Sequence, residues 1–599
     1  MMKTLGKFRS TLKISKEVIK LIWQTSKAYT IYVIILLILT SIIPILEAYF
    51  IKRIIDILTF SLQSKIEFNS VFLYLALFIA ATLFERIIAS QRNAIQIILG
   101  NLFNKKINQK IVEKTTKLAF WRFEDPKFHD KLDRTRDQAT WKPLNTFYYL
   151  FESLMNFFTL VSILIVFFTF SPLISILMII FTIPSLIVQL KYGEKWFNLL
   201  YDETPESRKL NYYQYLMAGH YETKDIKLLN LRNFLLIKYK TLYNKLFEEQ
   251  KSLIVKRYIL EFMGFILSDI MLVVFYFYLA WQTFLQKLSI GDFTFFSTLY
   301  TRANMSLQGL IRGIAGVYEN NLFINELIEF LNLEEEKLSL KHEKIPKIIK
   351  TIEFRDVWFK YPGTEECVLK GISFIISAEQ NVALVGENGA GKTTIVKLLT
   401  KLYDPTKGEI LMNNINIEKF DLNEYRNLIG VAFQDFAKFF FSVEENIKFG
   451  DINRKISKEE IIEVAKKAHI HKKIMTFPNK YSTTLGRWYH EGHEISYGEW
   501  QRIAIARALI KRCPVYVLDE PTAALDAKAE YLVFEEFKKH VIGKIAMFIS
   551  HRFSNVRLAN KILVLENGKI IQEGSHQELA KINGRYKELY EFQARSYRE

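Results

Sequence analysis

Cysteine is scarce in this chain, whose 599 residues include only Cys367 and Cys513. Two thiols so far apart in the sequence exclude a disulfide-rich secreted scaffold, and we interpret them as free cysteines in a reducing compartment. A secretory signal peptide is also lacking, because residues 1–27 hold seven Lys and Arg and are too polar for one. The part of the chain that carries the cysteines is therefore expected in the cytoplasm.

Acidic residues are in deficit. The chain has 63 Asp and Glu against 81 Lys and Arg, a formal net charge of +18, while 50% of its residues are hydrophobic. Apolar bulk with a basic excess is typical of a membrane protein whose basic loops face the cytoplasm. Nucleic-acid binding is the other common source of basicity. We expect no nucleic-acid partner, because the Lys and Arg are spread over loops. A chain of this length requires at least two domains.

Charge is absent altogether between Ser153 and Leu190. A helix needs roughly 20 residues to cross a bilayer core of about 30 Å, so this stretch is long enough for two spans joined by a tight turn at Ser171-Pro172. A buried hairpin in a soluble protein is disfavoured, because uncharged runs of this length are rare there. The sequence therefore predicts an integral membrane protein in contact with the lipid bilayer.

Four further segments complete a prediction of six membrane spans. The last is weak by hydropathy, because it carries Arg302, Arg312 and Glu319. Basic residues gather in two long loops, which we expect in the cytoplasm together with both chain ends. These loops are residues 105–145 and 191–257, and the further spans are expected at about 28–46, 69–84, 270–286 and 293–323.

Helical periodicity runs through both long loops, so the spans are expected to continue as helices beyond the bilayer. Residues 121–128 and 221–229 stand out within these loops. Each segment is either a solvated turn or the contact through which the membrane and soluble domains communicate.

Three polar residues of the sixth span, Asn304, Gln308 and Arg312, share one face of a helix. Intramembrane charge costs roughly 2.5–3.5 kcal/mol on insertion scales, so such residues usually face a bundle interior or a water-filled cavity. Structural pairing and cavity lining both remain open. The acidic residues considered as partners are Glu85, Glu261 and Asp269.

A nucleotide-binding motif lies in the second half of the chain. Residues 386–393 fit G-x-x-x-x-G-K-[ST], preceded by an apolar strand-like segment and followed by the first turns of a helix. Glycines let backbone N–H groups wrap phosphate oxygens, and the helix N-terminus adds its positive dipole end. Lys392 is placed to contact the β- and γ-phosphates, and the Thr393 hydroxyl to ligate Mg²⁺.

A second hydrophobic strand, residues 515–518, ends in Asp519 and Glu520. Asp519 is suited to orient Mg²⁺, and Glu520 to polarise the attacking water. Upstream, Tyr361-Pro362-Gly363 closes a predicted hairpin, and its aromatic ring is suited to stack on a base. The three features together predict an ATPase.

These motifs resemble those of ATP-binding cassette transporters of the exporter branch, and the resemblance covers essentially the whole chain. It implies an all-α six-helix transmembrane domain followed by an α/β P-loop nucleotide-binding domain. The expected parts are a cytoplasmic segment 1–27, a transmembrane domain 28–330, a linker 331–350 and a nucleotide-binding domain 351–599.

The resemblance also implies roles for single residues. ATP contacts are expected at Tyr361, Gly386, Glu387, Asn388, Gly389, Ala390, Gly391, Lys392, Thr393, Thr394, Ser496, Gly498, Glu499 and Asp526. Catalytic residues are expected at Glu520, His551 and Gln434, and Mg²⁺ contacts at Thr393, Gln434 and Asp519. One six-helix half with one ATPase implies a dimer, either with a second copy or with a related half-transporter. We expect it in a bacterial plasma membrane, with the nucleotide-binding domain in the cytoplasm.

One departure from the family pattern lies in the signature loop, where Tyr497 replaces the first glycine of Ser-Gly-Gly and Glu499 replaces glutamine. A tyrosine there either crowds the partner's ATP or points away from it. We expect the second, because the catalytic residues are otherwise complete.

The resulting prediction is an ATP-driven exporter of a peptide, lipid or amphiphilic small molecule. Only 27 residues precede the first span, which disfavours exporters that cut a leader from their own cargo. A lipid flippase remains the alternative within the fold. An ATP-gated channel or regulator is a further alternative, disfavoured because Glu520 is retained.

Overall fold

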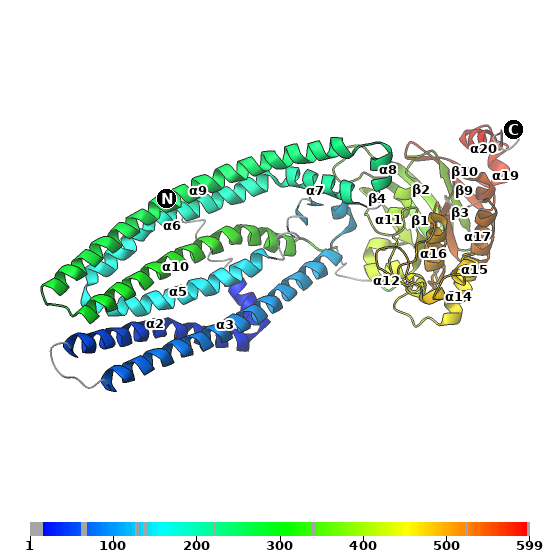
Figure 1. Cartoon of the computed structure of the whole chain (residues 1–599). Coiled ribbons are helices and arrows are strands. Elements are labelled where there is room, and N and C mark those ends of the chain that lie inside the picture. Colours follow the sequence, from blue (N-terminus) through cyan, green and yellow to red (C-terminus); the bar gives the residue numbers. More distant parts are fainter. Residues whose placement is uncertain are drawn as a thin grey trace. The chain divides into compact units, whose positions relative to one another are not determined.

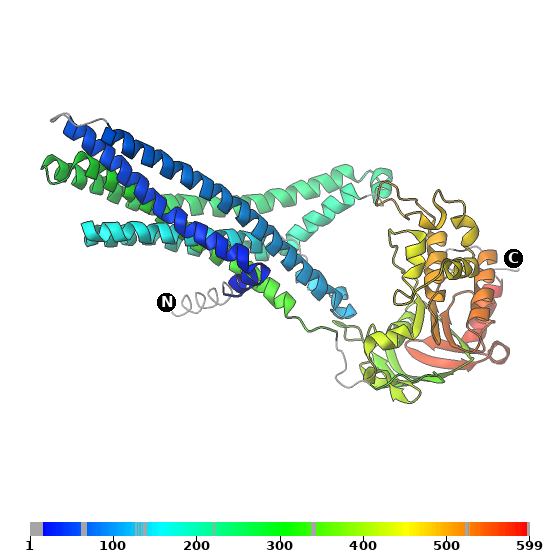
Figure 2. The same cartoon turned by 90° about the horizontal axis from the view of Figure 1, so that it is seen from below.

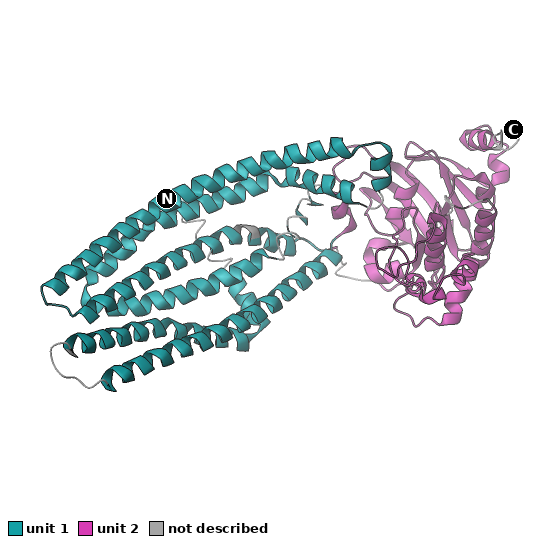
Figure 3. Cartoon of the chain, in the orientation of Figure 1, with its two compact units in different colours: residues 1–118, 126–335 teal, residues 119–125, 336–599 magenta. Residues whose placement is uncertain are grey.

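The computed structural model describes residues 16–61, 69–125, 128–129, 131–132, 135, 141–219, 222–336, 343–521, 525 and 527–595. The chain divides by its internal contacts into two compact units (Figure 3). Unit 1 comprises residues 1–118 and 126–335, and unit 2 comprises residues 119–125 and 336–599. The sequence does not predict that residues 119–125, which precede a membrane helix, group with unit 2.

Unit 1 is helical (Figure 1). A short helix at residues 16–25 precedes the longer ones. These are α2 (Lys27–Ser61), α3 (Asn69–Thr116), α5 (Lys142–Phe170), α6 (Pro172–Asp202), α7 (Thr204–Ala218), α8 (Thr223–Leu228), α9 (Arg232–Phe284) and α10 (Ile290–Leu331). Among the described residues, five helices are long and apolar enough to cross a membrane: α2, α3, α5, α6 and α9. The charged α10 is not in that group, as its weak hydropathy predicts.

Several helices of unit 1 exceed the thickness of a bilayer. α3, α9 and α10 contain 48, 53 and 42 residues, whereas roughly 20 suffice to cross the hydrocarbon core. Within the unit, α2 lies beside α3, and α6 beside α9, in both views (Figures 1 and 2). α2 and α3 are consecutive helices, and a short connection makes such a pair antiparallel neighbours; α7 and α8 lie between α6 and α9 in the chain.

Among the described helices of unit 1, α5 and α10 share the most extensive contact, and glycine permits their close approach. A Cβ atom at Gly313 would lie 2.1 Å from Ser153 Oγ, and one at Gly316 would lie 2.7 Å from the Tyr149 ring. Small residues let membrane helices approach closely where lipid offers no hydrophobic driving force. Any larger side chain at these two positions would push α10 away from α5.

The polar face predicted in the sixth span is divided in the structure. Asn304 is buried and accepts a hydrogen bond of 2.8 Å from Ser268 Oγ, so its partner is none of the acidic residues considered from the sequence. Gln308 is half-buried and Arg312 is exposed. Asn304 is therefore a packing position, and cavity lining stays a prediction for Gln308 and Arg312.

Other charges of unit 1 form ion pairs, either between helices or, for Arg257 and Glu261, within α9. Arg302 Nη2 lies 3.1 Å from Glu47 Oε2. Arg257 contacts Glu261 at 2.9 Å and Glu319 at 3.3 Å. Pairing is the usual way to offset the cost of charge inside a membrane bundle.

Unit 2 contains two sheets. The first is antiparallel, in the order β2-β1-β4-β5, and the second has the order β10-β9-β3-β8-β7-β6. In the second sheet β6, β7, β8, β3 and β9 run parallel, and β10 is an antiparallel edge strand. The strands are β1 (Thr351–Phe359), β2 (Leu369–Ser377), β3 (Asn381–Gly386), β4 (Lys407–Met412), β5 (Ile415–Asn416), β6 (Ile429–Ala432), β7 (Val515–Asp519), β8 (Ile545–Ile549), β9 (Lys561–Glu566) and β10 (Lys569–Gly574).

Helices surround the sheets of unit 2. The α-helices are α11 (Lys392–Leu399), α12 (Leu422–Asn427), α13 (Val443–Lys448), α14 (Lys458–Lys467), α15 (His471–Ile474), α16 (Tyr497–Leu509), α17 (Ala527–His540), α18 (Phe553–Val556), α19 (His576–Leu579) and α20 (Arg585–Arg595). The 3₁₀-helices are η1 (Phe120–Glu124), η2 (Ile417–Lys419) and η3 (Lys480–Ser482). β7 and β8 are buried throughout, which explains their continuous apolar runs.

The order of the parallel strands brings the predicted motifs together. β3, β8, β7 and β6 are consecutive neighbours. The phosphate loop follows β3, His551 follows β8, Glu520 follows β7 and Gln434 follows β6. Because parallel strands end at one edge of a sheet, these residues converge there, where ligands bind in open α/β sheets.

Candidate functional site

The phosphate loop joins β3 to α11. Gly389 and Gly391 have φ values of +84° and +104°, a region that favours glycine. Lys392 is buried, and its Nζ donates hydrogen bonds to the carbonyl oxygens of Gly386 at 2.9 Å and Glu387 at 2.8 Å. Burial lowers the pKa of Lys392. The ammonium group is thus held inside the loop, where a phosphate would supply its counter-charge.

Asp519 ends β7 beside the start of α11. Thr393 Oγ1 donates to Asp519 Oδ1 at 3.5 Å. The carboxyl is buried, and its Oδ2 atom has no hydrogen-bond partner among the described residues. Burial raises the pKa of Asp519 to about 6. A buried carboxylate oxygen without a partner, next to a threonine hydroxyl, fits a divalent cation with oxygen ligands.

Glu520 lies between two polar side chains. Gln434 Nε2 donates to one carboxylate oxygen at 2.8 Å, and His551 Nε2 lies 2.6 Å from the other. Glu520 has φ = +45°, an uncommon value for a residue with a side chain. Uncommon backbone conformations of this kind cluster at functional sites. The two contacts fix the orientation of the carboxylate above the phosphate loop.

Tyr361 closes the other end of the pocket. Its hydroxyl lies 3.0 Å from Thr394 Oγ1, and its ring meets those of Phe359 and Tyr403 edge-on at 4.9 and 5.3 Å. The pocket measures about 660 Å³ and is lined by Tyr361, Val368, Asn388, Gly389, Gly391, Lys392, Thr393, Thr394, Gln434, Glu520 and His551. It therefore combines an aromatic wall, a phosphate-binding loop and a fixed carboxylate.

The remaining predicted residues lie at different places. Glu387 is exposed and forms an ion pair with Arg585, while Ala390 is buried under the loop. Ser496 caps α16, in a capping box with Glu499. Neither these two nor Gly498 lines the pocket of this chain. Asp526 lies outside the described residues.

Comparison with known proteins places these features in a family. A family model described as ABC transporter matches residues 369–523. The chain is 32% identical to the subtilin transport ATP-binding protein SpaT of Bacillus subtilis, over 98% of this chain and 95% of that protein. The chain belongs to the ABC transporter family. The nisin transport ATP-binding protein NisT of Lactococcus lactis is 30% identical, over 98% of this chain and 97% of that protein.

A solved structure confirms the fold of this ABC transporter. A bacterial Atm1-family ABC exporter with ATP bound matches with a TM-score of 0.82 and 22% identity, over 95% of this chain and 98% of that one. The predicted fold class, a helical membrane domain followed by an α/β nucleotide-binding domain, is confirmed. The protein is a multi-pass integral membrane ATPase with an ATP-binding domain, and it acts as an ATP-driven exporter.

The signature loop of this ABC transporter is attached to its own chain at two points. The Tyr497 hydroxyl donates to the main-chain oxygen of Gln434 at 3.2 Å. Glu499 lies 3.2 Å from Lys473 Nζ, and hydrogen bonds from Ser496 and Lys473 lower the pKa of Glu499 despite its partial burial. Both residues that depart from the family pattern therefore make intrachain contacts.

Sequence reasoning about this ABC transporter missed the contacts made by η1. Lys397 Nζ of α11 lies 3.1 Å from Glu124 Oε1, and the Tyr403 hydroxyl donates to the same carboxylate. Lys397 Nζ also lies 5.7 Å from the Phe120 ring centroid and 5.3 Å from that of Tyr361. A loop between two membrane helices thus touches the aromatic wall of the ATP pocket. The sequence singled out residues 121–128 as a possible contact segment, but it did not indicate Lys397 and Tyr403 as the residues contacted.

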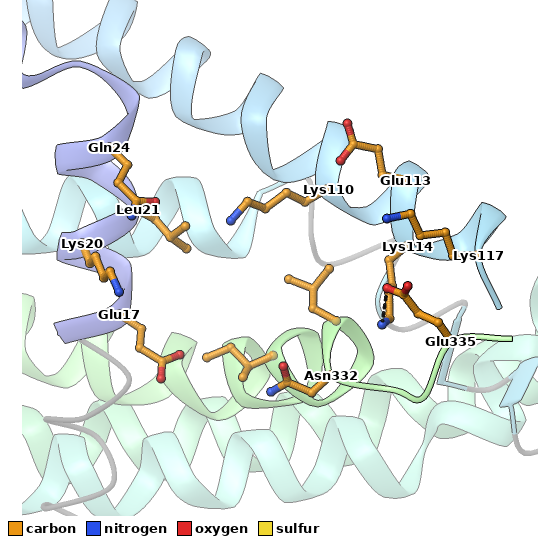
Figure 4. Close-up of a pocket in the computed structure, with 12 residues that line it drawn as sticks. Glu17, Lys20, Leu21, Gln24, Lys110, Glu113, Lys114, Lys117, Asn332 and Glu335 are labelled. Carbon is orange, nitrogen blue, oxygen red and sulfur yellow. Dashed lines mark hydrogen bonds and ion pairs between the residues drawn. The ribbon is translucent and has the colours of Figure 1, made fainter. Parts of the chain in front are cut away.

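A second pocket lies within unit 1 of the transporter, between the helix 16–25 and the ends of α3 and α10 (Figure 4). It measures about 560 Å³, and Lys114 within it pairs with Glu335 at 3.0 Å. Four lysines and three glutamates line it, so its charge selects neither anions nor cations. The lining residues are Glu17, Lys20, Leu21, Gln24, Lys110, Glu113, Lys114, Lys117, Ile328, Leu331, Asn332 and Glu335.

Proposed function

We propose that this protein exports a peptide from a bacterial cytoplasm across the plasma membrane, working as a dimer of two copies. The observation that carries the proposal is the similarity over nearly the whole chain to SpaT and NisT, which are exporters of the peptides subtilin and nisin. A match that includes the membrane unit extends to the part of a transporter that contacts cargo. The basic loops predicted on the cytoplasmic side support the same orientation.

ATP binds in the pocket of unit 2 in this proposal. Tyr361 stacks on the adenine, the loop from Gly386 to Gly391 wraps the phosphates, and Lys392 contacts the β- and γ-phosphates. Thr393, Asp519 and Gln434 hold Mg²⁺, which neutralises phosphate charge when bound. The partnerless Oδ2 of Asp519 supports this assignment.

Hydrolysis is assigned to Glu520. The carboxylate accepts a proton from a water molecule while the water oxygen attacks the γ-phosphorus. The bond between the γ-phosphorus and the bridging oxygen breaks, and that oxygen leaves with ADP. His551 and Gln434 keep the carboxylate aimed at that water through their contacts at 2.6 and 2.8 Å. Such positioning of an attacking group is a large part of catalysis in phosphoryl transfer.

A second copy supplies the missing part of the site. Ser496 and Gly498 do not line the pocket of their own chain. We assign the backbone N–H groups of this signature loop to the γ-phosphate of ATP held by the facing subunit, and Glu499 and Asp526 to the same interface between the two copies. A two-fold dimer is the simplest closed arrangement that completes both sites. A related half-transporter as partner is the alternative.

Reconstitution in inside-out proteoliposomes tests the proposed cargo. With ATP outside, a panel of labelled amphiphilic peptides and fluorescent phospholipids is offered, and uptake and phosphate release are measured together. We expect peptide uptake that stimulates ATP hydrolysis and disappears in Glu520→Gln. Movement of phospholipid alone would contradict the peptide proposal and favour the flippase.

A further inference from the structure

The signature helix α16 contacts the catalytic residues of its own chain at two points. Tyr497 donates through its hydroxyl to the main-chain oxygen of Gln434 at 3.2 Å, and Gln501 Nε2 donates to that of Glu520 at 3.3 Å. Positions i and i+4 share one face of a helix, so one face of α16 makes both contacts. Gln434 in turn donates a hydrogen bond of 2.8 Å to the Glu520 carboxylate, so the two residues that α16 contacts are also bonded to each other.

The ring of Tyr497 is held as well as its hydroxyl. It lies 5.4 Å from the Phe436 ring, and Lys438 Nζ lies 5.1 Å from its centroid. The side chain is thus placed against the segment that follows Gln434, although 46% of Tyr497 remains exposed. Glycine has no side chain, so the usual residue of the family pattern makes none of these contacts.

We propose that Tyr497 is a positioning residue that joins the signature loop to Gln434, so that both move as one body. The proposal rests on the proposed dimer, in which the signature loop faces the partner's ATP and Gln434 faces the chain's own. ATP bound at one site then sets the position of the loop at the other. Tyr497 therefore strengthens cooperation between the two sites and does not obstruct the partner's ATP.

The ATP dependence of hydrolysis by the full chain in lipid nanodiscs tests this link. Tyr497→Phe keeps the ring against Phe436 and removes only the hydroxyl, whose hydrogen bond is worth a factor of about two to ten. We expect kcat to fall by about that factor and the Hill coefficient for ATP to fall towards one, with a smaller change in KM. In Tyr497→Gly, kcat and the Hill coefficient should both fall further than in Tyr497→Phe. Tyr489→Phe, at an exposed tyrosine of the same unit, is the matched control and should behave as the parent.

Two results would overturn the proposal. The first is an unchanged kcat and Hill coefficient in Tyr497→Phe. The second is faster turnover in Tyr497→Gly, which would mean that the tyrosine obstructs the partner's ATP. Dimerisation is measured separately, by energy transfer between labelled copies of Glu520→Gln in ATP. If the labelled copies do not dimerise, both the proposed dimer and the coupling through Tyr497 are contradicted. If they dimerise but Tyr497→Phe leaves the Hill coefficient unchanged, only the coupling through Tyr497 is contradicted.

Discussion

In unit 2 the chemically active side chains stand at the ends of neighbouring strands and line one pocket, whereas in unit 1 several charged side chains of the long helices form ion pairs. Asp519 keeps a buried carboxylate oxygen without a partner, while Arg302 and Arg257 both have acidic partners. A partnerless carboxylate oxygen beside a phosphate loop points to a ligand, whereas a satisfied pair points to structure. Glu203 of unit 1 also has a buried oxygen without a partner among the described residues, but no such loop lies beside it. This difference explains why the bound nucleotide can be inferred from the residues of unit 2, whereas the cargo cannot be inferred from those of unit 1.

The largest effect is expected from Glu520→Gln, which keeps the shape of the side chain and removes its basicity. Turnover should fall by about 10²–10⁴, the usual contribution of a positioned general base. ATP binding should persist, because the phosphate loop is intact. Phosphate release and binding of a fluorescent ATP analogue measure the two quantities, with the exposed Glu418→Gln as control. Parental turnover in Glu520→Gln would assign the base elsewhere.

Lys392→Ala should weaken ATP binding by about 10- to 150-fold, because a hydrogen bond to a charged group contributes about 1.5–3 kcal/mol. Binding of the same fluorescent analogue measures the loss. Lys407→Ala, which removes an exposed lysine of the same unit, should bind as the parent does. Equal affinity in both variants would mean that the loop does not hold the phosphates.

A smaller effect is expected from Glu124→Gln. The Glu124–Lys397 pair is partly exposed, and such pairs contribute about 0.2–1 kcal/mol, which is at most about fivefold. Since Glu124 lies outside the ATP pocket, we expect peptide uptake per ATP to fall by up to that factor while basal hydrolysis stays nearly constant. Asp404→Asn, which removes a surface pair of 3.9 Å in the same unit, is the matched control. Equal loss of hydrolysis and uptake would show that Glu124 merely supports the pocket.

The smallest effect on activity is expected from cysteines placed in α10 of a chain without Cys367 and Cys513. Arg312→Cys should react with a water-soluble thiol reagent, because residue 312 is exposed, whereas Asn304→Cys should not, because residue 304 is buried against Ser268. Mass spectrometry measures the labelled fraction with and without ATP. Labelling at residue 304 and not at residue 312 would contradict the assignment of Asn304 to packing and the predicted water access of Arg312.

The sequence predicts those parts of the site that depend on local chemistry. The phosphate loop and the Asp519-Glu520 pair are short motifs whose residue types are dictated by phosphate and Mg²⁺. The contacts of Glu124 with Lys397 and of Tyr497 with Gln434 join residues far apart in the chain, and no local pattern encodes them. Asn304 shows the same limit, because its position on a helical face was predictable but its partner Ser268 was not.

Helix α20 contacts two segments that border the ATP pocket, the phosphate loop and the residues that follow β8. Arg585 pairs with Glu387 of the phosphate loop, and the Gln593 amide accepts from the Phe553 N–H at 2.8 Å and donates to the His551 carbonyl at 3.1 Å. Removing this helix would release the backbone on either side of Arg552, directly after His551. An affinity handle or fluorescent fusion attached close after residue 593 would therefore pull on the backbone that carries His551.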